Sequence, residues 1–551
     1  MGSRRNMLSP LLVVAGTALV LVTPLTAAAA STPKATSTPA TTWITRPLPP
    51  ATGTNLTRNE DGEPGLAVTP SGEFWVASDI APYASDDPRV DPVAGLLTGA
   101  DVWSSSDGGR NYSWRSDPFA EAATQFGLAG EDSDVTVATE KNSNGFYNIY
   151  ATSLWVGSSG LAWSTDGGKT WQLNRLGGVP TQDRPWLAAD GACDVFIAYH
   201  QLPTFTPVVN DYDVCTNGNV PVSGGATIDP ANSTTLTLSD FPGTSNSFNK
   251  LTIDTSPTSP HRHAIYVPMS LCAAETETDL LIAQASGCNG TQYLVAVSTD
   301  GGTTFTYRPV VVDPSNAVLV WAATVSTDAA GNVYFTWSDA HNSYLNVSHD
   351  GGTTWSKSKK LNAPKTAAVY PTVAGGKAGR VDVAWYGTGR AGNSNDSKVM
   401  GKPNADGSAP WYVILARSTD GGGTFKLRTV SQVIHRGELC TGGSGCGDTN
   451  SRNLLDDFGL AISPTTGLDS IAYTDDQPQG EGGTTFTAFA SELAAPIVHI
   501  FRPPHHPTSS GVTKKLAATG STLAPPIAGL ALVLAGLSLR RRRTVRGARA
   551  S

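Results

Sequence analysis

Polar and aromatic side chains recur just before short runs of alternating apolar residues, a pattern typical of β-strands. Carboxylates at such positions can transfer protons or hold sugar hydroxyls, an arginine can hold an anion, and aromatic rings can stack on the apolar face of a sugar. The residues concerned are Asp61, Glu63, Glu131, Asp132, Asp134, Asp183, Arg184, Trp186, Trp321, Tyr370, Asp456 and Asp457. For any single acid, capping a strand, bonding a neighbouring sheet and holding calcium stay open as alternatives. A repeating architecture would bring these residues, which are far apart in sequence, to one place.

An eight-residue motif supplies such a repeat. Its copies are 164–171 (Ser-Thr-Asp-Gly-Gly-Lys-Thr-Trp), 298–305, 348–355 and 418–425, with a looser copy at 105–112. Each octet has a serine two positions before an aspartate, two glycines directly after that aspartate, and an aromatic residue five positions after it. Glycine supplies the positive φ of a tight turn, and the carboxylate and hydroxyl accept backbone N–H bonds at its tip. The octets therefore predict hairpin turns, each pinned to a sheet edge by its aromatic ring.

The octets resemble the Asp-box, or bacterial neuraminidase repeat, of sialidases and related β-propeller proteins. This resemblance implies that each octet joins the third and fourth strands of a propeller blade, on the face away from the ligand site. It implies the fold far more than the activity. The repeated aspartates could instead be read as catalytic acids or calcium ligands, but the turn chemistry favours a structural role.

Apolar strand pairs between the octets predict the number of blades. Seven such pairs occur, and each supplies the first two strands of a blade that an octet completes. Between Asp166 and Asp300 the interval is long enough to hide a lost copy, and 215–218 (Cys-Thr-Asn-Gly) reads as a degenerate octet. We expect an all-β, sialidase-like propeller of four-stranded blades over 43–500, with seven blades favoured and six as the alternative. Residues 42–48 are expected to add the outermost strand of the last blade.

A propeller would gather the polar residues around its central channel, because the loops that lead into every first strand open on one face. The resemblance to sialidases implies a trap of three arginines for a substrate carboxylate, a tyrosine paired with a glutamate as nucleophile, and an aspartate for proton transfer. The candidates for these roles are Arg184, Arg436 and Arg452, then Tyr370 with Glu131 or Glu63, then Asp61 or Asp132. The Phe/Tyr-Arg-Ile-Pro element of that family is absent. The corresponding stretch 61–66 reads Asp-Gly-Glu-Pro-Gly-Leu, and its acids would repel a sialic acid carboxylate.

Two classes of function follow. The first is a surface propeller that recognises glycans or glycoproteins and cleaves a glycosidic bond, as an exo-acting glycoside hydrolase. The second is a non-catalytic adhesin or scaffold that binds protein or wall polymer through long loops at 80–98, 201–210, 270–292 and 388–410. A net charge of −8 without a basic stripe argues against nucleic acid as a partner. No cofactor is expected, although 447–457 offers oxygen ligands for calcium without the spacing of an EF-hand.

Six cysteines in an exported chain should form disulfides. Fifteen connectivities are possible. Locality in the sequence favours Cys193 with Cys215, Cys272 with Cys288, and Cys440 with Cys446. In the first pair one cysteine opens the second strand of a blade and the other closes the third, so the two ends would lie side by side.

Both ends of the chain carry addresses. Residues 1–30 have the basic start, apolar middle and small-residue end of a secretory signal, and 31–42 form a flexible spacer. A stalk at 501–515 precedes segment 516–551, in which Leu-Ala-Ala-Thr-Gly, an apolar run at 523–539 and a basic tail resemble a sortase sorting signal. The resemblance implies cleavage between Thr519 and Gly520 and attachment to the cell wall. A plain C-terminal membrane anchor is the alternative, and both predict an extracellular protein.

Overall fold

Short strands between glycine-rich turns pair with their sequence neighbours into antiparallel sheets. The computed structural model describes residues 41–53, 59–80, 99–120, 129–155, 158–175, 182–201, 206–219, 221–222, 226–227, 249–272, 291–313, 323–441, 450–477 and 485–494. All of them belong to one unit that spans residues 1–495. Within these residues the strands form seven sheets, each with a path of four strands.

The sheets follow one another in chain order, and we number them as blades 1 to 7. Blade 1 contains β2 (Asp61–Val68), β3 (Phe74–Ile80), β4 (Ala100–Ser105) and β5 (Ser113–Ser116). Blade 2 contains β6 (Ala129–Lys141), β7 (Tyr147–Trp155), β8 (Ser158–Ser164) and β9 (Gln172–Asn174). Blade 3 contains β10 (Gln182–Asp190), β11 (Asp194–Gln201), β12 (Thr206–Asp213) and β13 (Ala226–Thr227), with helix α2 (Val214–Asn217) after β12. Blade 4 contains β14 (Thr252–Ile253), β15 (Ile265–Cys272), β16 (Thr291–Ser298) and β17 (Thr306–Asp313).

The remaining blades repeat this order. Blade 5 contains β18 (Thr324–Thr327), β19 (Val333–Ser338), β20 (Ser343–Ser348) and β21 (Lys359–Lys360). Blade 6 contains β22 (Ala367–Gly375), β23 (Val381–Thr388), β24 (Pro410–Ser418) and β25 (Lys426–Thr429), with β26 (His435–Arg436) also paired to β24 and helix α4 (Ser397–Met400) before it. Blade 7 contains β27 (Gly459–Ile462), β28 (Asp469–Asp475), β29 (Phe486–Ala494) and β1 (Thr41–Pro47), and the short helix η4 (Asn450–Arg452) precedes it.

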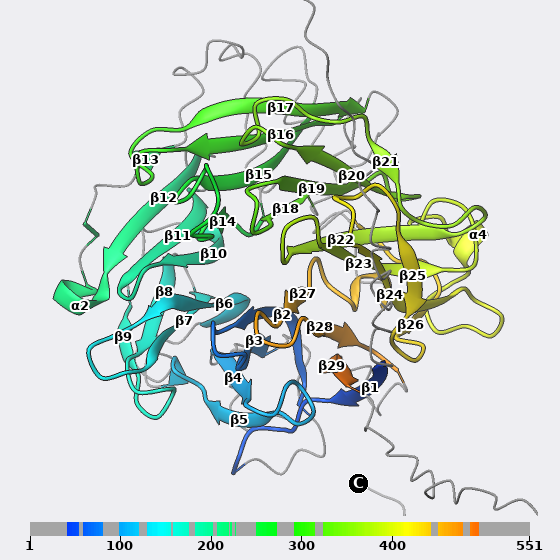
Figure 1. The fold of residues 1–551 in the computed structure, drawn as a ribbon. Helices are drawn as coiled ribbons and strands as arrows, with labels where there is room; N and C mark the ends of the chain where they lie inside the picture. Colours follow the sequence, from blue (N-terminus) through cyan, green and yellow to red (C-terminus); the bar gives the residue numbers. More distant parts are fainter. Residues whose placement is uncertain are drawn as a thin grey trace, which may run out of the picture. The chain divides into compact units, whose positions relative to one another are not determined.

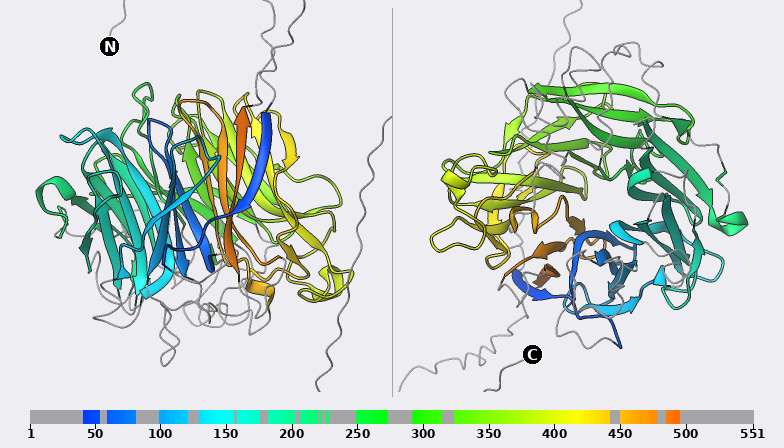
Figure 2. Two further views of the ribbon diagram at one scale, coloured as in Figure 1. Left: turned by 90° about the horizontal axis from the view of Figure 1, so that it is seen from below. Right: turned by 180° about the vertical axis from the view of Figure 1, so that it is seen from behind.

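The seven blades close into a ring. Strands β2, β6, β10, β14, β18, β22 and β27 are the innermost of their blades, each contacts the next, and β27 contacts β2 (Figure 1). Figure 2 shows the ring edge-on, with the strands running from one face to the other. The prediction of an all-β propeller with seven four-stranded blades is confirmed.

Both ends of the described chain meet in blade 7. Strand β1 runs antiparallel to β29, with Thr41 opposite Ala494 and Pro47 opposite Ala488. The predicted outermost strand at 42–48 is therefore confirmed, and it begins slightly earlier, at Thr41. The ring is closed by non-covalent pairing between residues more than 400 positions apart, and the Thr41 hydroxyl, for example, donates to Glu492 across a sequence separation of 451.

The octets form the turns between third and fourth strands. In the octet of blade 5, the Ser348 hydroxyl accepts a hydrogen bond of 2.8 Å from Gly352 N, and Oδ1 and Oδ2 of Asp350 accept 2.8 Å and 2.6 Å bonds from Thr354 N and Oγ1. The Thr354 hydroxyl in particular lowers the pKa of Asp350 to about 2, against a smaller opposing effect of desolvation. The octet aspartates are thus committed to turn structure. Strand register places these turns on the face opposite to the starts of the first strands.

The second glycine of an octet also lets the turn approach the preceding blade. Gly168 has a φ of +78°, and a Cβ at this position would lie 2.4 Å from the ring of Trp75 in β3. Trp75 is fully buried and belongs to an apolar cluster that blades 1 and 2 share. Apolar clusters of this kind between neighbouring blades form the core of the ring.

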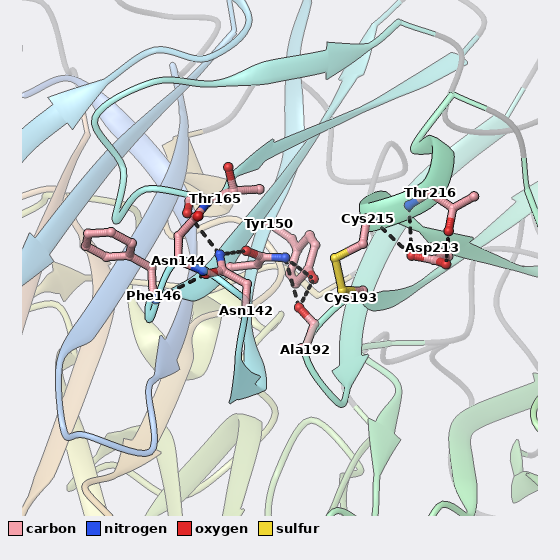
Figure 3. The surroundings of a disulfide bond; sticks show 11 residues. Asn142, Asn144, Phe146, Tyr150, Thr165, Ala192, Cys193, Asp213, Cys215 and Thr216 are labelled. Atoms are coloured by element: carbon pink, nitrogen blue, oxygen red, sulfur yellow. Dashed lines mark hydrogen bonds between the residues drawn. A yellow bond between two sulfur atoms is a disulfide. The ribbon is translucent and has the colours of Figure 1, made fainter.

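The disulfide between Cys193 and Cys215 is confirmed, with Cα atoms 5.5 Å apart (Figure 3). The predicted degenerate octet at 215–218 needs a correction. Helix α2 begins there instead of a glycine hairpin, and Asp213 takes the carboxylate role assigned to Asn217. Asp213 accepts hydrogen bonds from Cys215 N at 2.9 Å and from the Thr216 hydroxyl at 2.6 Å. The two bonds use both carboxylate oxygens of Asp213, whereas an asparagine side chain has one acceptor oxygen.

Several predictions fall on residues that are not described. Cys440 is disulfide-bonded, but its predicted partner Cys446 lies outside the described residues. Cys288 also lies outside them, and for Cys272 only the backbone at the end of β15 is described. The same holds for the signal at 1–30, nearly all of the spacer, the stalk, and the sorting signal with Thr519 and Gly520. No helix in the described ranges is long and apolar enough to span a membrane.

Candidate functional site

Four first strands begin with the same backbone irregularity. In β2, β6, β10 and β22 the register shifts by a bulge near the start of the strand. The residue in the bulge has positive φ in each case, and these residues are Glu63 (46°), Asp132 (45°), Arg184 (56°) and Tyr370 (51°). A non-glycine residue held in a sparsely populated region costs about 1–3 kcal/mol, and such residues cluster at functional sites. Bulges also re-aim side chains. All four residues are predicted site residues, so the same bulge recurs at the positions from which the site was expected to be built.

The bulges are a feature that our reading of the sequence missed. The sequence contains a signal for the bulges, because proline follows three of the four residues, at Pro64, Pro185 and Pro371. Leu455, which precedes β27, also has a positive φ, of 58°.

An ion cluster ties three blades together at the ring centre. Oδ2 of Asp456 accepts a 2.7 Å hydrogen bond from Nη2 of Arg452 and a second, shorter one from Nη2 of Arg184. The backbone N–H of Asp456 donates to Oε1 of Glu63 at 3.0 Å. Asp456 and Arg184 are both almost fully buried. The cluster therefore joins the segment before blade 7 to the first strands of blades 1 and 3.

Neighbouring carboxyl groups in this cluster have opposite pKa shifts. Burial acts to raise the pKa of Asp456, but Arg452 and Arg184 outweigh it and lower the pKa. Burial raises the pKa of Asp457 well above its usual range, with Arg184 opposing the rise and Asp132 adding to it. Burial likewise raises the pKa of Glu63, followed by repulsion from Asp132 and Asp457. The surroundings thus favour the ionised form of Asp456 and the protonated forms of Asp457 and Glu63.

Tyr370 lies in the same cluster. Its hydroxyl donates a 3.1 Å hydrogen bond to the backbone carbonyl of Cys440. Burial, followed by the charge of Asp456, raises the pKa of Tyr370 well above its usual range, with Arg452 and Arg184 opposing. The phenol is therefore protonated at neutral pH. Its role as a nucleophile stays a prediction.

A cavity of about 160 Å³ lies at the ring centre next to this cluster. Its polar lining includes Asp134, Trp186, Asn249, Lys250, Thr324, Tyr370, Asp456 and Asp457. Within the described part of the chain, the indole N–H of Trp186 has no acceptor and Oδ1 of Asp456 has no donor. These two polar atoms are therefore buried beside the cavity without a partner among the described residues.

Lys250 and Asp134 form the other charged pair of the cavity. Nζ of Lys250 lies 2.7 Å from Oδ1 of Asp134, and Oδ2 accepts a 2.9 Å bond from Leu187 N. Burial raises the pKa of Asp134, with Lys250 as the main opposing influence. Asn249 and Lys250 were not among the predicted residues. They precede the first strand of blade 4 as the other candidates precede theirs, so the same positional rule could have found them.

The structure brings together most of the predicted residues. Those in the cluster or the cavity are Glu63, Asp132, Asp134, Arg184, Trp186, Tyr370, Arg452, Asp456 and Asp457. Asp61 lies buried at the start of β2, two residues before Glu63. The third predicted arginine, Arg436, lies in β26 opposite Pro410. The hydrogen bonds that Asp456 accepts from arginines of the described residues come from Arg184 and Arg452, not from Arg436. The backbone of Glu131 and Asp183 lies in β6 and β10, but their side chains and all of Trp321 lie outside what the structure describes.

Metal binding finds little support in the residues at hand. Two arginines occupy Oδ2 of Asp456, and this positive surrounding disfavours a calcium ion there. Among the described residues, one group of three potential ligands lies together, Cys193, Asp213 and Cys215, and its two sulfur atoms form the disulfide. Most of the loop between Cys440 and Asn450 is not described.

These features define a seven-bladed β-propeller with a buried, charged hub. No family model matches the chain, and no curated protein matches it. Solved structures that it resembles include a protein of unknown function from Dyadobacter fermentans, with 14% identity, a TM-score of 0.40, and coverage of 80% of this chain and 98% of the other. An α-L-arabinanase from Penicillium chrysogenum, complexed with arabinobiose, has 12% identity, a TM-score of 0.40, and coverage of 83% and 99%. An intramolecular trans-sialidase from Ruminococcus gnavus has 12% identity, a TM-score of 0.35, and coverage of 79% and 95%. Similarity this low carries nothing about the reaction, so activity is inferred from this chain's own residues.

Proposed function

We propose that the chain is a glycan-recognising propeller that hydrolyses a glycosidic bond in its hub cavity. One observation carries the proposal: Asp456 and Asp457 line the same cavity, and their pKa values are shifted in opposite directions. Two carboxyl groups in opposite protonation states are what acid-assisted glycoside hydrolysis requires. Trp186 and Tyr370 add aromatic walls for a sugar ring.

The roles follow from the protonation states. Asp457 donates its proton to the glycosidic oxygen as the bond to the anomeric carbon breaks. Asp456, ionised and bonded to Arg184 and Arg452, carries no proton to donate, which leaves the role of the acid to Asp457. Water then forms the new bond to the anomeric carbon, and its proton returns to Asp457. The small enclosed volume favours one terminal sugar residue, and therefore exo-action.

The test is turnover by the full chain on a panel of fluorogenic glycosides. The panel pairs neutral sugars with acidic ones, including sialic acid and glucuronic acid. Release of fluorophore from at least one glycoside is expected. No turnover on any glycoside, with retained binding on a glycan or protein array, would instead support a non-catalytic adhesin or scaffold.

The proposed site of action is outside the cell. The secretory and sorting patterns at the two ends of the sequence support a protein attached to the wall or the membrane. Fractionation of the cells that make it tests this proposal. Recovery from the wall fraction that shifts to the membrane fraction in the Thr519→Ala variant would indicate sortase attachment. Recovery of both chains from the membrane fraction would indicate a plain anchor.

A further inference from the structure

The hub contains an arginine pair that is already bound to a carboxylate of the chain itself. Arg184 and Arg452 both donate to the same oxygen of Asp456. The side chain of Asp456 has 0% exposure and that of Arg184 has 5%, whereas Arg452 has 34%. Planar guanidinium groups that converge on one oxygen form a typical site for an anion. Here the anion is built in.

An external anion would have to displace Asp456 from this position. Asp456 is held by its backbone, whose N–H bonds to Glu63, so its carboxylate is present at a high effective concentration. Displacing it would leave a buried carboxylate without its arginine partners, which is strongly unfavourable. The Nη2 donors of Arg184 and Arg452 are thus committed to Asp456, and the described lining of the cavity includes neither arginine.

The other charges around the cavity lead to the same result. Lys250, the one cationic side chain in the described lining of the cavity, is paired with Asp134 at 2.7 Å. Asp134, Asp456 and Asp457 line the same cavity, so its described lining contains more acidic side chains than basic ones. Trp186 and Tyr370 also line the cavity, and neither side chain carries a positive charge. Both suit sugar hydroxyls and the apolar face of a ring.

We propose that Asp456 is a specificity-determining residue, which acts as an internal counter-ion to Arg184 and Arg452 and restricts the hub to neutral sugars. This inference rests on the proposed function for the identity of the ligand as a sugar. The contact between Asp456 and the arginine pair does not depend on turnover, and it can be tested by binding alone.

The first experiment removes the internal anion. Asp456→Ala leaves two arginines without a partner, and we expect a lower unfolding temperature than in the unchanged chain. Sodium acetate should then raise that temperature by at least about 2 °C more than sodium chloride at equal ionic strength, because acetate can take the vacated position. Asp457→Asn is the matched control, since it removes the adjacent carboxylate but leaves the arginine pair occupied, and it should show no acetate-specific shift. A folded Asp456→Ala chain without an acetate-specific shift would overturn the proposal.

The second experiment uses the unchanged chain, so it does not depend on the folding of a variant. Binding of glucuronic acid and of N-acetylneuraminic acid is compared with binding of their methyl esters, which lack the negative charge. We expect each ester to bind at least about tenfold more tightly than its acid, and tighter binding of either acid would contradict the inference. Turnover of an acidic glycoside would support the hydrolase proposal and refute this one. An acetate-specific rise in the unfolding temperature of Asp456→Ala, without turnover of any glycoside, would support the role of Asp456 and contradict the hydrolase proposal.

Discussion

The backbone N–H of Asp456 donates a 3.0 Å hydrogen bond to Oε1 of Glu63, across a sequence separation of 393. This bond joins the segment before blade 7 to the first strand of blade 1, where the ring closes. The same two residues have opposite pKa shifts, because burial, followed by neighbouring acids, raises the pKa of Glu63, whereas Arg452 and Arg184 outweigh burial and lower the pKa of Asp456. A hydrogen bond at the closure of the ring therefore joins a glutamate with a raised pKa to an aspartate with a lowered pKa.

The pH dependence of turnover should reflect Asp457. Burial raises its pKa well above 3.8, so the group stays protonated at pH values where an exposed aspartate is ionised. We expect kcat to fall as the pH rises through this elevated value, because the general acid then loses its proton. A pH profile of kcat measures this. A rate that keeps rising to pH 9 would contradict the role of Asp457 as an acid.

Stability should fall with rising pH because of Asp211 in β12. Burial, followed by repulsion from Asp194, raises the pKa of Asp211 to about 7. The folded state therefore binds this proton more tightly than the unfolded state, and its contribution to stability is lost between about pH 4 and pH 7. Asp211→Asn should be more stable than the unchanged chain at pH 8, by about 2 kcal/mol once solvent screening is considered, and equal to it at pH 4. Denaturant unfolding at the two pH values checks this, and an equal difference at both would refute it.

The disulfide between Cys193 and Cys215 should stabilise blade 3. It closes a segment with a sequence separation of 22 and links the turn before β11 to helix α2. Replacing both cysteines with serine should lower the free energy of unfolding by about 3 kcal/mol, because the unfolded chain regains loop entropy. The hub lies on the opposite face, so sugar binding should persist. A change below about 0.5 kcal/mol would show that the bond does not brace this blade.

Glycine at position 168 should be required for blade contact as well as for the turn. Gly168→Ala places a Cβ 2.4 Å from Trp75, whereas Gly301, the first glycine of another octet, has nothing within 4 Å of such an atom. Both have positive φ, so Gly301→Ala measures the cost of the turn alone, about 1 kcal/mol. Gly168→Ala should cost about 1–3 kcal/mol more, the usual effect of overpacking. Equal losses in the two variants would contradict the packing argument.

The sequence predicted the fold well because repetition makes local turn chemistry visible. The octets and the seven strand pairs are patterns within short stretches of the chain, whereas the closure by β1 follows from the strand that the last blade lacks. The degenerate octet was misaligned by four residues, since a helix with Asp213 as its cap replaces the glycine turn. Short polar side chains can build such alternatives from the same composition.

The candidate site was predicted in its position but not in its pairing. The rule that residues before first strands converge correctly gathered Glu63, Arg184 and Tyr370. It could not show that Arg184 and Arg452 share Asp456, nor that Arg436 lies in β26, because side-chain pairing depends on backbone bulges and on distances across the ring. The same dependence hid Lys250 as the partner of Asp134.

Turnover by Asp457→Asn tests the central claim most directly. The variant keeps the shape of the side chain but cannot donate a proton, so kcat on the best neutral glycoside should fall by about 10²–10⁴-fold. Asp350→Asn, a matched change in an octet on the opposite face, should keep kcat within about twofold while losing about 1 kcal/mol of stability. Asp457→Asn with undiminished kcat would contradict hydrolysis in the hub cavity.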